Sequence, residues 1–133
     1  MKIKRLSVIL LAMTLSVMLI SCSKTKSVES KIIGKWHVSS IMEINSAGGD
    51  WHDALYNQNI DYEFKEDGSV VAYVNGSSAG AGSWSYDQDA DKLMFASRPY
   101  DIEELDEHQM VLYYAYTSSV VHLEQRMTLE KLQ

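Results

Sequence analysis

Acidic side chains at alternate positions are the first pattern in this sequence that could do chemistry. Asp87, Asp89 and Asp91 have the spacing of the first three ligands of a calcium-binding loop. An EF-hand loop also needs a glycine at its sixth position and a bidentate glutamate at its twelfth, where this chain has Lys92 and Arg98. The pattern therefore favours an acidic hairpin turn over a calcium site, and no metal site is predicted.

The remaining titratable side chains do not assemble into a catalytic motif. A second acidic cluster could supply paired carboxylates for glycoside hydrolysis, but nothing separates the pKa values of its members, so a solvated face is favoured. The four histidines lack metal-ligand spacing, and no Gly-x-Ser-x-Gly elbow is present. No catalytic residue and no cofactor are therefore predicted, and an enzyme ranks third among the functions considered. The acidic cluster comprises Asp101, Glu103, Glu104, Asp106 and Glu107, and the histidines are His37, His52, His108 and His122.

The single cysteine, Cys22, offers a different chemistry. It follows a basic start and an apolar run over residues 6–20, which is short for a spanning helix and typical of a cleavable signal peptide. Leu19-Ile20-Ser21-Cys22 has the form of a bacterial lipobox, at which cleavage leaves a lipid-bearing cysteine at the new N-terminus. A plain N-terminal anchor, or secretion with a chance cysteine, are the alternatives. The lipoprotein reading predicts attachment to a membrane through the acyl chains on Cys22.

Three segments follow from this assignment: a signal peptide over residues 1–21, a lipidated flexible tether over residues 22–31, and one domain over residues 32–133. Cleavage would remove three of the 12 basic residues and none of the 18 acidic ones, which leaves a net charge of −9. Such a charge argues against nucleic acid as a partner. We expect a monomer in the cell envelope, anchored at the outer membrane and facing the periplasm.

The domain shows alternation of apolar and polar residues with a period of two, which predicts β-strands. Residues 59–65, 83–86, 92–96 and 110–116 show this alternation, which is clearest in the last two strands, and Gly68 ends a hairpin turn. In the final strand Val121, Leu123, Met127 and Leu129 are predicted to face inward. Residues 76–82 are predicted to form a loop because of their Gly, Ser and Ala content, and residues 47–57 could hold a helical turn. About eight strands spaced as a meander point to a sandwich or an up-and-down barrel.

Several short sequence segments resemble those of the lipocalin-like lipoproteins of Bacteroidetes. The first resembles the lipocalin Gly-x-Trp, and together they cover most of residues 32–130. This resemblance implies an all-β, lipocalin-like, antiparallel up-and-down barrel of about eight strands. It also implies that a basic residue late in the barrel packs on the first tryptophan, and Arg126 over Trp36 is the candidate pair, which would close one end of the barrel. The segments are Ile33-Gly34-Lys35-Trp36, Phe64-Lys65-Glu66-Asp67-Gly68, Gly82-Ser83-Trp84-Ser85-Tyr86, and Ile102-Glu103-Glu104-Leu105 followed by Met110-Val111-Leu112.

Aromatic residues, most of them with a polar tip, provide the remaining functional signal. Five of them fall on faces predicted to be inward, where they would suit a small, largely apolar ligand with one polar end. The alternative is that they simply fill the core. We therefore consider two functions. In the first, the chain is an envelope lipoprotein that binds a small apolar ligand. In the second, it is a structural or accessory lipoprotein with a filled barrel that binds a protein or glycan on its outer surface. The five candidate ligand-binding residues are Tyr62, Trp84, Phe95, Tyr114 and Tyr116.

Overall fold

The computed structural model describes residues 27–45 and 48–133. The chain divides into two units, Met1–Ser30 and Lys31–Gln133, and the described strands belong to the second. The predicted signal peptide and the predicted lipidation site at Cys22 lie outside the described residues. The prediction of a flexible tether up to Lys31 differs from the structure in its described part, because residues 27–32 are helical.

Ten strands make up the second unit, so the prediction of an all-β, antiparallel domain is confirmed, with more strands than the eight or so expected. They are β1 (Gly34–Asn45), β2 (Gly48–Asp53), β3 (Ile60–Phe64), β4 (Ser69–Val74), β5 (Ser77–Ser83), β6 (Ser85–Asp87), β7 (Lys92–Phe95), β8 (Arg98–Leu105), β9 (Gln109–Thr117) and β10 (His122–Lys131).

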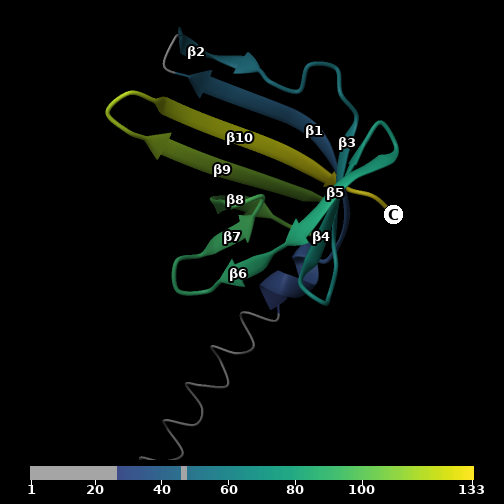
Figure 1. Cartoon of the computed structure of the whole chain (residues 1–133). Helices are drawn as coiled ribbons and strands as arrows, with labels where there is room; N and C mark the ends of the chain where they lie inside the picture. The colour runs from purple at the N-terminus through teal and green to yellow at the C-terminus, as the bar shows by residue number, and fades with distance from the viewer. Residues whose placement is uncertain (1–26, 46–47) are drawn as a thin grey trace, which may run out of the picture. The chain divides into compact units, whose positions relative to one another are not determined.

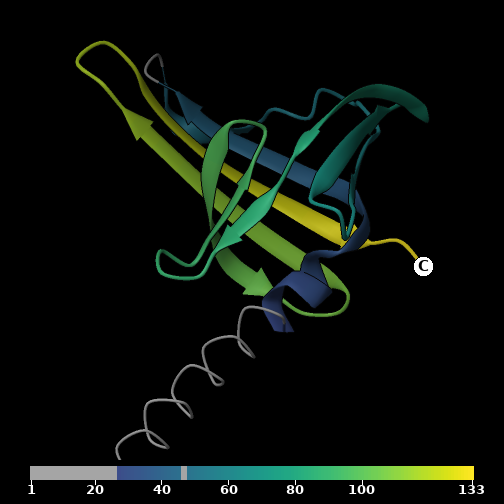
Figure 2. The ribbon, with the colours of Figure 1, turned by 60° about the horizontal axis from the view of Figure 1, so that its bottom comes forward.

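The strands form one sheet that bends into a nearly closed barrel (Figures 1 and 2). The order along the sheet is β5-β4-β3-β1-β10-β9-β8-β7-β6, with β2 paired to the second half of β1. The two strands at the ends of this path, β5 and β6, are consecutive in the chain and are separated only by Trp84. Since one residue joins the ends of the path, the sheet has to curve back on itself. This is a meander, with the first and last long strands, β1 and β10, side by side.

The core forms inside this curve because apolar side chains occupy alternate positions of facing strands. On β9 and β10, Leu112 lies opposite Met127 and Met110 opposite Leu129, and all four side chains are buried. Gln125 continues the same inward row and is the one buried polar residue among those described. Other strands add Trp36, Val38, Phe64, Val70, Leu93, Phe95 and Tyr100 to the core, and Trp84, between β5 and β6, is also buried.

Two predictions of irregular structure are wrong. Residues 77–82, predicted as part of a loop, belong to strand β5, which pairs with β4 from Ser69↔Ser83 to Val74↔Ser77. Backbone hydrogen bonds to a neighbouring strand do not depend on side chains, so this pairing overrides the low strand propensity of Gly and Ser. Gly48–Asp53 is likewise a strand, β2, paired with β1, and not a helical turn.

Candidate functional site

The strand pair β5 and β6 leaves the barrel open on one side. Trp84 divides one continuous stretch of chain: before it β5 pairs with β4, and after it β6 pairs with β7. The Trp84 backbone N–H donates to Gly68 O at 2.9 Å, and its indole Nε1 donates to Lys65 O at 2.8 Å, which fixes this change of partner. β7 ends at Phe95, because the chain turns at Ala96 and Ser97, both with positive φ. Within the described chain, β5 therefore has no partner strand on the side that faces this turn.

The gap beside β5 is hollow, and we call it the β5 opening. It comprises a depression of about 630 Å³ and an adjoining apolar pocket of about 210 Å³. The two share Ala81, Gly82, Phe95 and Ala96 in their linings. The larger depression is also lined by Ser83, Trp84, Ser85, Met94, Ser97 and Arg98, and the smaller pocket by Tyr62, Val70, Ala72 and Gly80.

Three aromatic residues, Tyr62, Trp84 and Phe95, line the β5 opening, and Phe95 is the centre of a larger group of rings that extends beyond the lining. The Phe95 ring meets Tyr62 and Phe64 edge-on, at centroid distances of 5.3 and 5.2 Å, and it stacks on Tyr100 at 4.8 Å. These arrangements are the ones that aromatic quadrupoles favour. Further contacts extend the group, because Trp84 meets Phe64 at 5.8 Å and Tyr114 meets Tyr100 at 5.7 Å.

Four of the five predicted ligand-binding residues belong to this aromatic group: Tyr62, Trp84, Phe95 and Tyr114. Trp84 and Phe95 are themselves buried, so they support the wall of the opening as well as lining it. Tyr116 lies apart from them, near the end of β9, and is 50% exposed. The strand period correctly predicts its side of β9, but it cannot show that β9 and β10 continue as a hairpin beyond the region where other strands cover them.

Four polar residues in or beside the interior were not predicted as site residues from the sequence. Tyr100 donates its hydroxyl hydrogen bond to Gln125 Oε1 at 3.1 Å, and Gln125 Nε2 donates to Glu43 Oε1 at 2.6 Å. Arg98, which the sequence marks only as the residue in place of the calcium-loop glutamate, lies with its Cζ 5.0 Å from the centroid of the Tyr114 ring. Burial raises the pKa of both Tyr62 and Tyr100, and the positive charge of Arg98 opposes that rise in each case. The sequence does hold one signal for this position: Arg98 and Tyr100 are two residues apart on β8, so their side chains lie on the same face of the strand.

The predicted pair of Trp36 and Arg126 is wrong, because Trp36 has a different basic partner. Lys131 Nζ lies 5.1 Å from the centroid of the Trp36 ring, and these two residues are directly opposite each other on β10 and β1. Trp36 is fully buried, and its Nε1 donates to Ile32 O at 2.7 Å. Lys131 Nζ also donates to Lys31 O at 2.8 Å, and burial lowers the Lys131 pKa.

Arg126 instead belongs to an aromatic and charged cluster on the outer face, which we call the Trp51 cluster. Its guanidinium donates two hydrogen bonds to the carboxylate of Glu103, at 2.8 and 3.0 Å. The same group lies 5.1 Å from the ring centroid of Trp51 and 5.6 Å from that of Tyr113. Trp51, on β2, is 36% exposed. The cluster is therefore an accessible patch that combines rings with charge.

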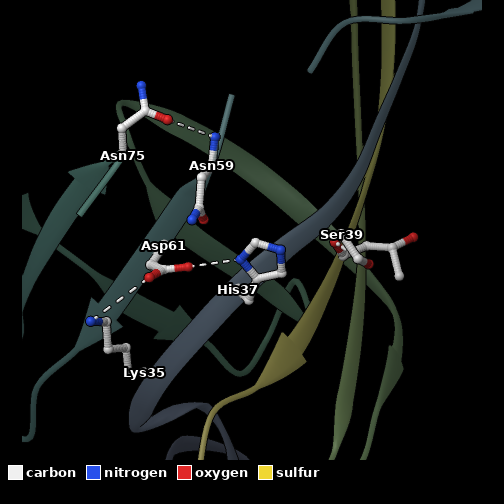
Figure 3. A network of polar contacts seen from close by, with 7 residues as sticks. Lys35, His37, Ser39, Asn59, Asp61 and Asn75 are labelled. Carbon is white, nitrogen blue, oxygen red and sulfur yellow. Dashed lines mark hydrogen bonds and ion pairs between the residues drawn. The ribbon is translucent and has the colours of Figure 1, made fainter. Parts of the chain in front are cut away.

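A third group of polar residues lies on β1 and β3 (Figure 3). His37 Nδ1 is 2.8 Å from Asp61 Oδ1, and Lys35 Nζ is 3.7 Å from the other Asp61 oxygen. Ser39, two residues further along β1, donates its hydroxyl hydrogen bond to Thr128 O at 3.2 Å. Among the described residues no hydrogen bond joins Ser39 to His37, and neither residue lines the β5 opening. This geometry favours a structural contact between β1 and β3.

The carboxylates of the acidic turn after β6 accept hydrogen bonds from residues of the turn and of the adjoining strand. Asp87 Oδ1 accepts the backbone N–H groups of Asp89 and Ala90, at 3.0 and 3.1 Å, and Asp91 accepts the hydroxyl hydrogen bond of Tyr86 at 2.6 Å. Across residues 27–45 and 48–133, no group of three or more His, Cys, Asp or Glu side chains is arranged to hold a metal ion.

Within the same ranges, the structure contains no helix with the length and apolar character needed to cross a membrane. Comparison of the chain with models of protein families, with curated proteins and with solved structures finds no match.

Proposed function

We propose that this chain is a lipid-anchored protein of the cell envelope, whose lipocalin-like barrel binds a small, largely apolar molecule at the β5 opening. The observation that carries the proposal is the interrupted closure of the barrel at Trp84. It leaves a depression of about 630 Å³, within the range typical of small-molecule sites, next to an apolar pocket walled by Tyr62 and Phe95.

The sequence supports the anchoring part of this proposal. Residues 1–21 have the three parts of a signal peptide, and Cys22 ends a lipobox. Acyl chains on Cys22 would hold the acidic domain at the membrane surface, with the outer membrane and the periplasm as the proposed location. The barrel would act as a monomer without a cofactor, and nucleic acid is not a proposed partner.

Native mass spectrometry of the full chain, purified as the cell processes it, tests both parts. We expect a mature chain that begins at Cys22 and carries covalent acyl chains, together with a reproducible non-covalent adduct of small mass that denaturation removes. Gly82→Leu should abolish the adduct, because Gly82 lines both depressions, lacks a positive φ, and has its nearest other atom 4.0 Å from the position of a Cβ. The new side chain would then fill the opening without strain.

Gly49→Leu is the matched control for this variant. Gly49 lies on β2, has no atom within 4 Å of its Cβ position, and is outside the opening. The Gly49→Leu chain should therefore keep the non-covalent adduct. A parent chain without adduct, even after incubation with an envelope lipid extract, would contradict ligand binding. A mature chain without acyl mass on Cys22 would contradict the anchor.

The Trp51 cluster favours a second candidate function. If the barrel interior is effectively filled by its aromatic group, the protein is a structural or accessory lipoprotein that binds a protein or glycan through Trp51, Tyr113 and Arg126. An exposed tryptophan near paired charges is the kind of surface that such partners use. A bare barrel in the mass spectrum, combined with a partner lost on Trp51→Ala, would support this function over the first.

A further inference from the structure

Arg98 stands out from the other basic residues of the barrel unit. Lys31–Gln133 holds seven basic and seventeen acidic residues, and six of the seven basic side chains lie near a carboxylate. Within the described chain Arg98 has no carboxylate partner, and its neighbours are tyrosines. The six pairs are Lys31 with Asp106, Lys35 with Asp61, Lys65 with Asp67, Lys92 with Asp101, Arg126 with Glu103, and Lys131 with Glu107.

This arginine lies where a ligand would enter. Arg98 is the first residue of β8, directly after the turn that ends β7, and it lines the larger depression of the β5 opening. Its side chain is partly buried, in a unit with an excess of ten negative charges. A partly buried guanidinium without an anion is unfavourable, because its lost hydration is not replaced by a charged partner. The site is therefore complementary to an anion.

One tyrosine hydroxyl of the β5 opening is also available as a donor. Tyr100 uses its hydroxyl on Gln125, but the hydroxyl of Tyr62, which lines the apolar pocket, forms no hydrogen bond with a described residue. A guanidinium fork matches the two oxygens of a carboxylate, and a tyrosine hydroxyl can donate a further hydrogen bond to a polar group of the same ligand. Arg98 and Tyr62 thus supply donors beside an apolar pocket.

We infer that the molecule bound at the β5 opening is a carboxylate with a compact aromatic body, whose acidic group is bound by Arg98. This inference rests on the proposed function and names its ligand class. The apolar pocket of about 210 Å³ suits a single ring better than a long acyl chain, and Tyr62 and Phe95 can pack against that ring edge to face. A carboxylate is favoured over a phosphate because the net charge of −10 repels a dianion more strongly than a monoanion.

Isothermal titration calorimetry of the full processed chain with three probes tests the inference. The probes are 4-phenylbutyrate, the neutral alcohol 4-phenylbutan-1-ol, and 4-phenylbutyl phosphate, which share one apolar body. We expect the carboxylate to bind about 10- to 100-fold more tightly than the alcohol, the gain expected of hydrogen bonds to a charged group, and more tightly than the phosphate.

Arg98→Gln should remove the preference for the carboxylate and leave the affinity for the alcohol unchanged. Arg98→Lys keeps the charge without the planar fork, so it should retain part of the preference, which guards against a folding defect in the first variant. Lys92→Gln, which removes a basic side chain that is paired with Asp101 and lies outside the lining of the opening, should behave like the parent chain.

Each contrary result has a distinct meaning. If the alcohol binds as tightly as the carboxylate, or if Arg98→Gln keeps the preference, the role of Arg98 is wrong while ligand binding at the opening stands. If the phosphate binds most tightly, the assignment to carboxylates is wrong. If none of the three probes binds while the chain still carries its adduct in native mass spectrometry, the assignment to a compact aromatic carboxylate is wrong and the proposed function stands. If the adduct is absent as well, the proposed function fails and the inference fails with it.

Discussion

Two basic residues on β10 show how one strand position decides the role of a side chain. Arg126 and Lys131 are five residues apart, an odd number, so they lie on opposite faces of the strand. Lys131 faces inward over Trp36, and Arg126 faces outward toward Trp51 and Glu103. The sequence marks both as late basic residues, but the register of β1 against β10 determines which of them meets Trp36.

Tyr86 supports a prediction about pH. Burial, the hydrogen bond to Asp91 and the charges of Asp91 and Asp87 raise the Tyr86 pKa from 10.0 to about 12. The tyrosine therefore contributes stability that is intact below pH 10 and lost as the pH rises from 10 to about 12, because the unfolded chain loses this proton first. The free energy of unfolding of Tyr86→Phe should be about 1 kcal/mol lower than that of the parent chain at neutral pH. It should also fall less steeply than that of the parent chain as the pH rises through this alkaline range.

Urea denaturation at a series of pH values measures this effect. Tyr56→Phe is the control, since Tyr56 is 71% exposed in a turn, and its stability should follow that of the parent chain at every pH. A Tyr86→Phe curve parallel to the parent curve above pH 10 would contradict the assignment.

The element that shapes the site is the continuous stretch of β5, Trp84 and β6. A strand inside a closed barrel has one partner on each side, but here each half has a single partner. The turn at Ala96 and Ser97 ends β7 before it can reach β5. Alternation of side chains predicts β6 and β7, but the length of β7 relative to β5 depends on pairing between segments, so the opening itself was not predicted.

Trp84→Phe tests the change of partner at this point. Phenylalanine preserves much of the ring contact with Phe64 but removes the indole N–H, so Lys65 O keeps only its hydrogen bond from the Gly68 N–H. We expect a loss of about 1 kcal/mol in the free energy of unfolding, the net contribution of one hydrogen bond, measured by chemical denaturation. Trp51→Phe, on the outer face, should change it by about 0.5 kcal/mol or less. Equal effects of the two substitutions would mean that the indole hydrogen bond does not hold the strands together.

At the scale of the whole barrel unit, closure depends on its two ends. β1 and β10 pair along almost their full length, from Trp36↔Lys131 to Asn45↔Leu123, although most of the domain sequence separates them. Figures 1 and 2 show β1, β10 and β9 side by side along the sheet. Such non-local pairing makes folding slow and prevents the barrel from closing until the last strand is available.

A chain that ends at Val121 tests this dependence, because it lacks β10 entirely. We expect it to show no cooperative unfolding transition, since β1 and β9 both lose their shared neighbour. The control is a chain without Gln133, an exposed terminal residue, which should keep the parent unfolding midpoint by circular dichroism. A cooperative transition in the shorter chain would show that the remaining strands close without β10.

The sequence by itself determined the local features of this protein. Alternation in residues 60–64 and 110–116 specified strands and their inward faces, Gly68 specified a turn, and the excess of acidic residues specified the charge. These properties depend on neighbours within a few residues. Only the tertiary structure decided that residues 77–83 form a strand, that Lys131 covers Trp36, and that Arg98 lies among tyrosines at an opening. Each of these depends on the register and length of strands far apart in the chain, which no local pattern encodes.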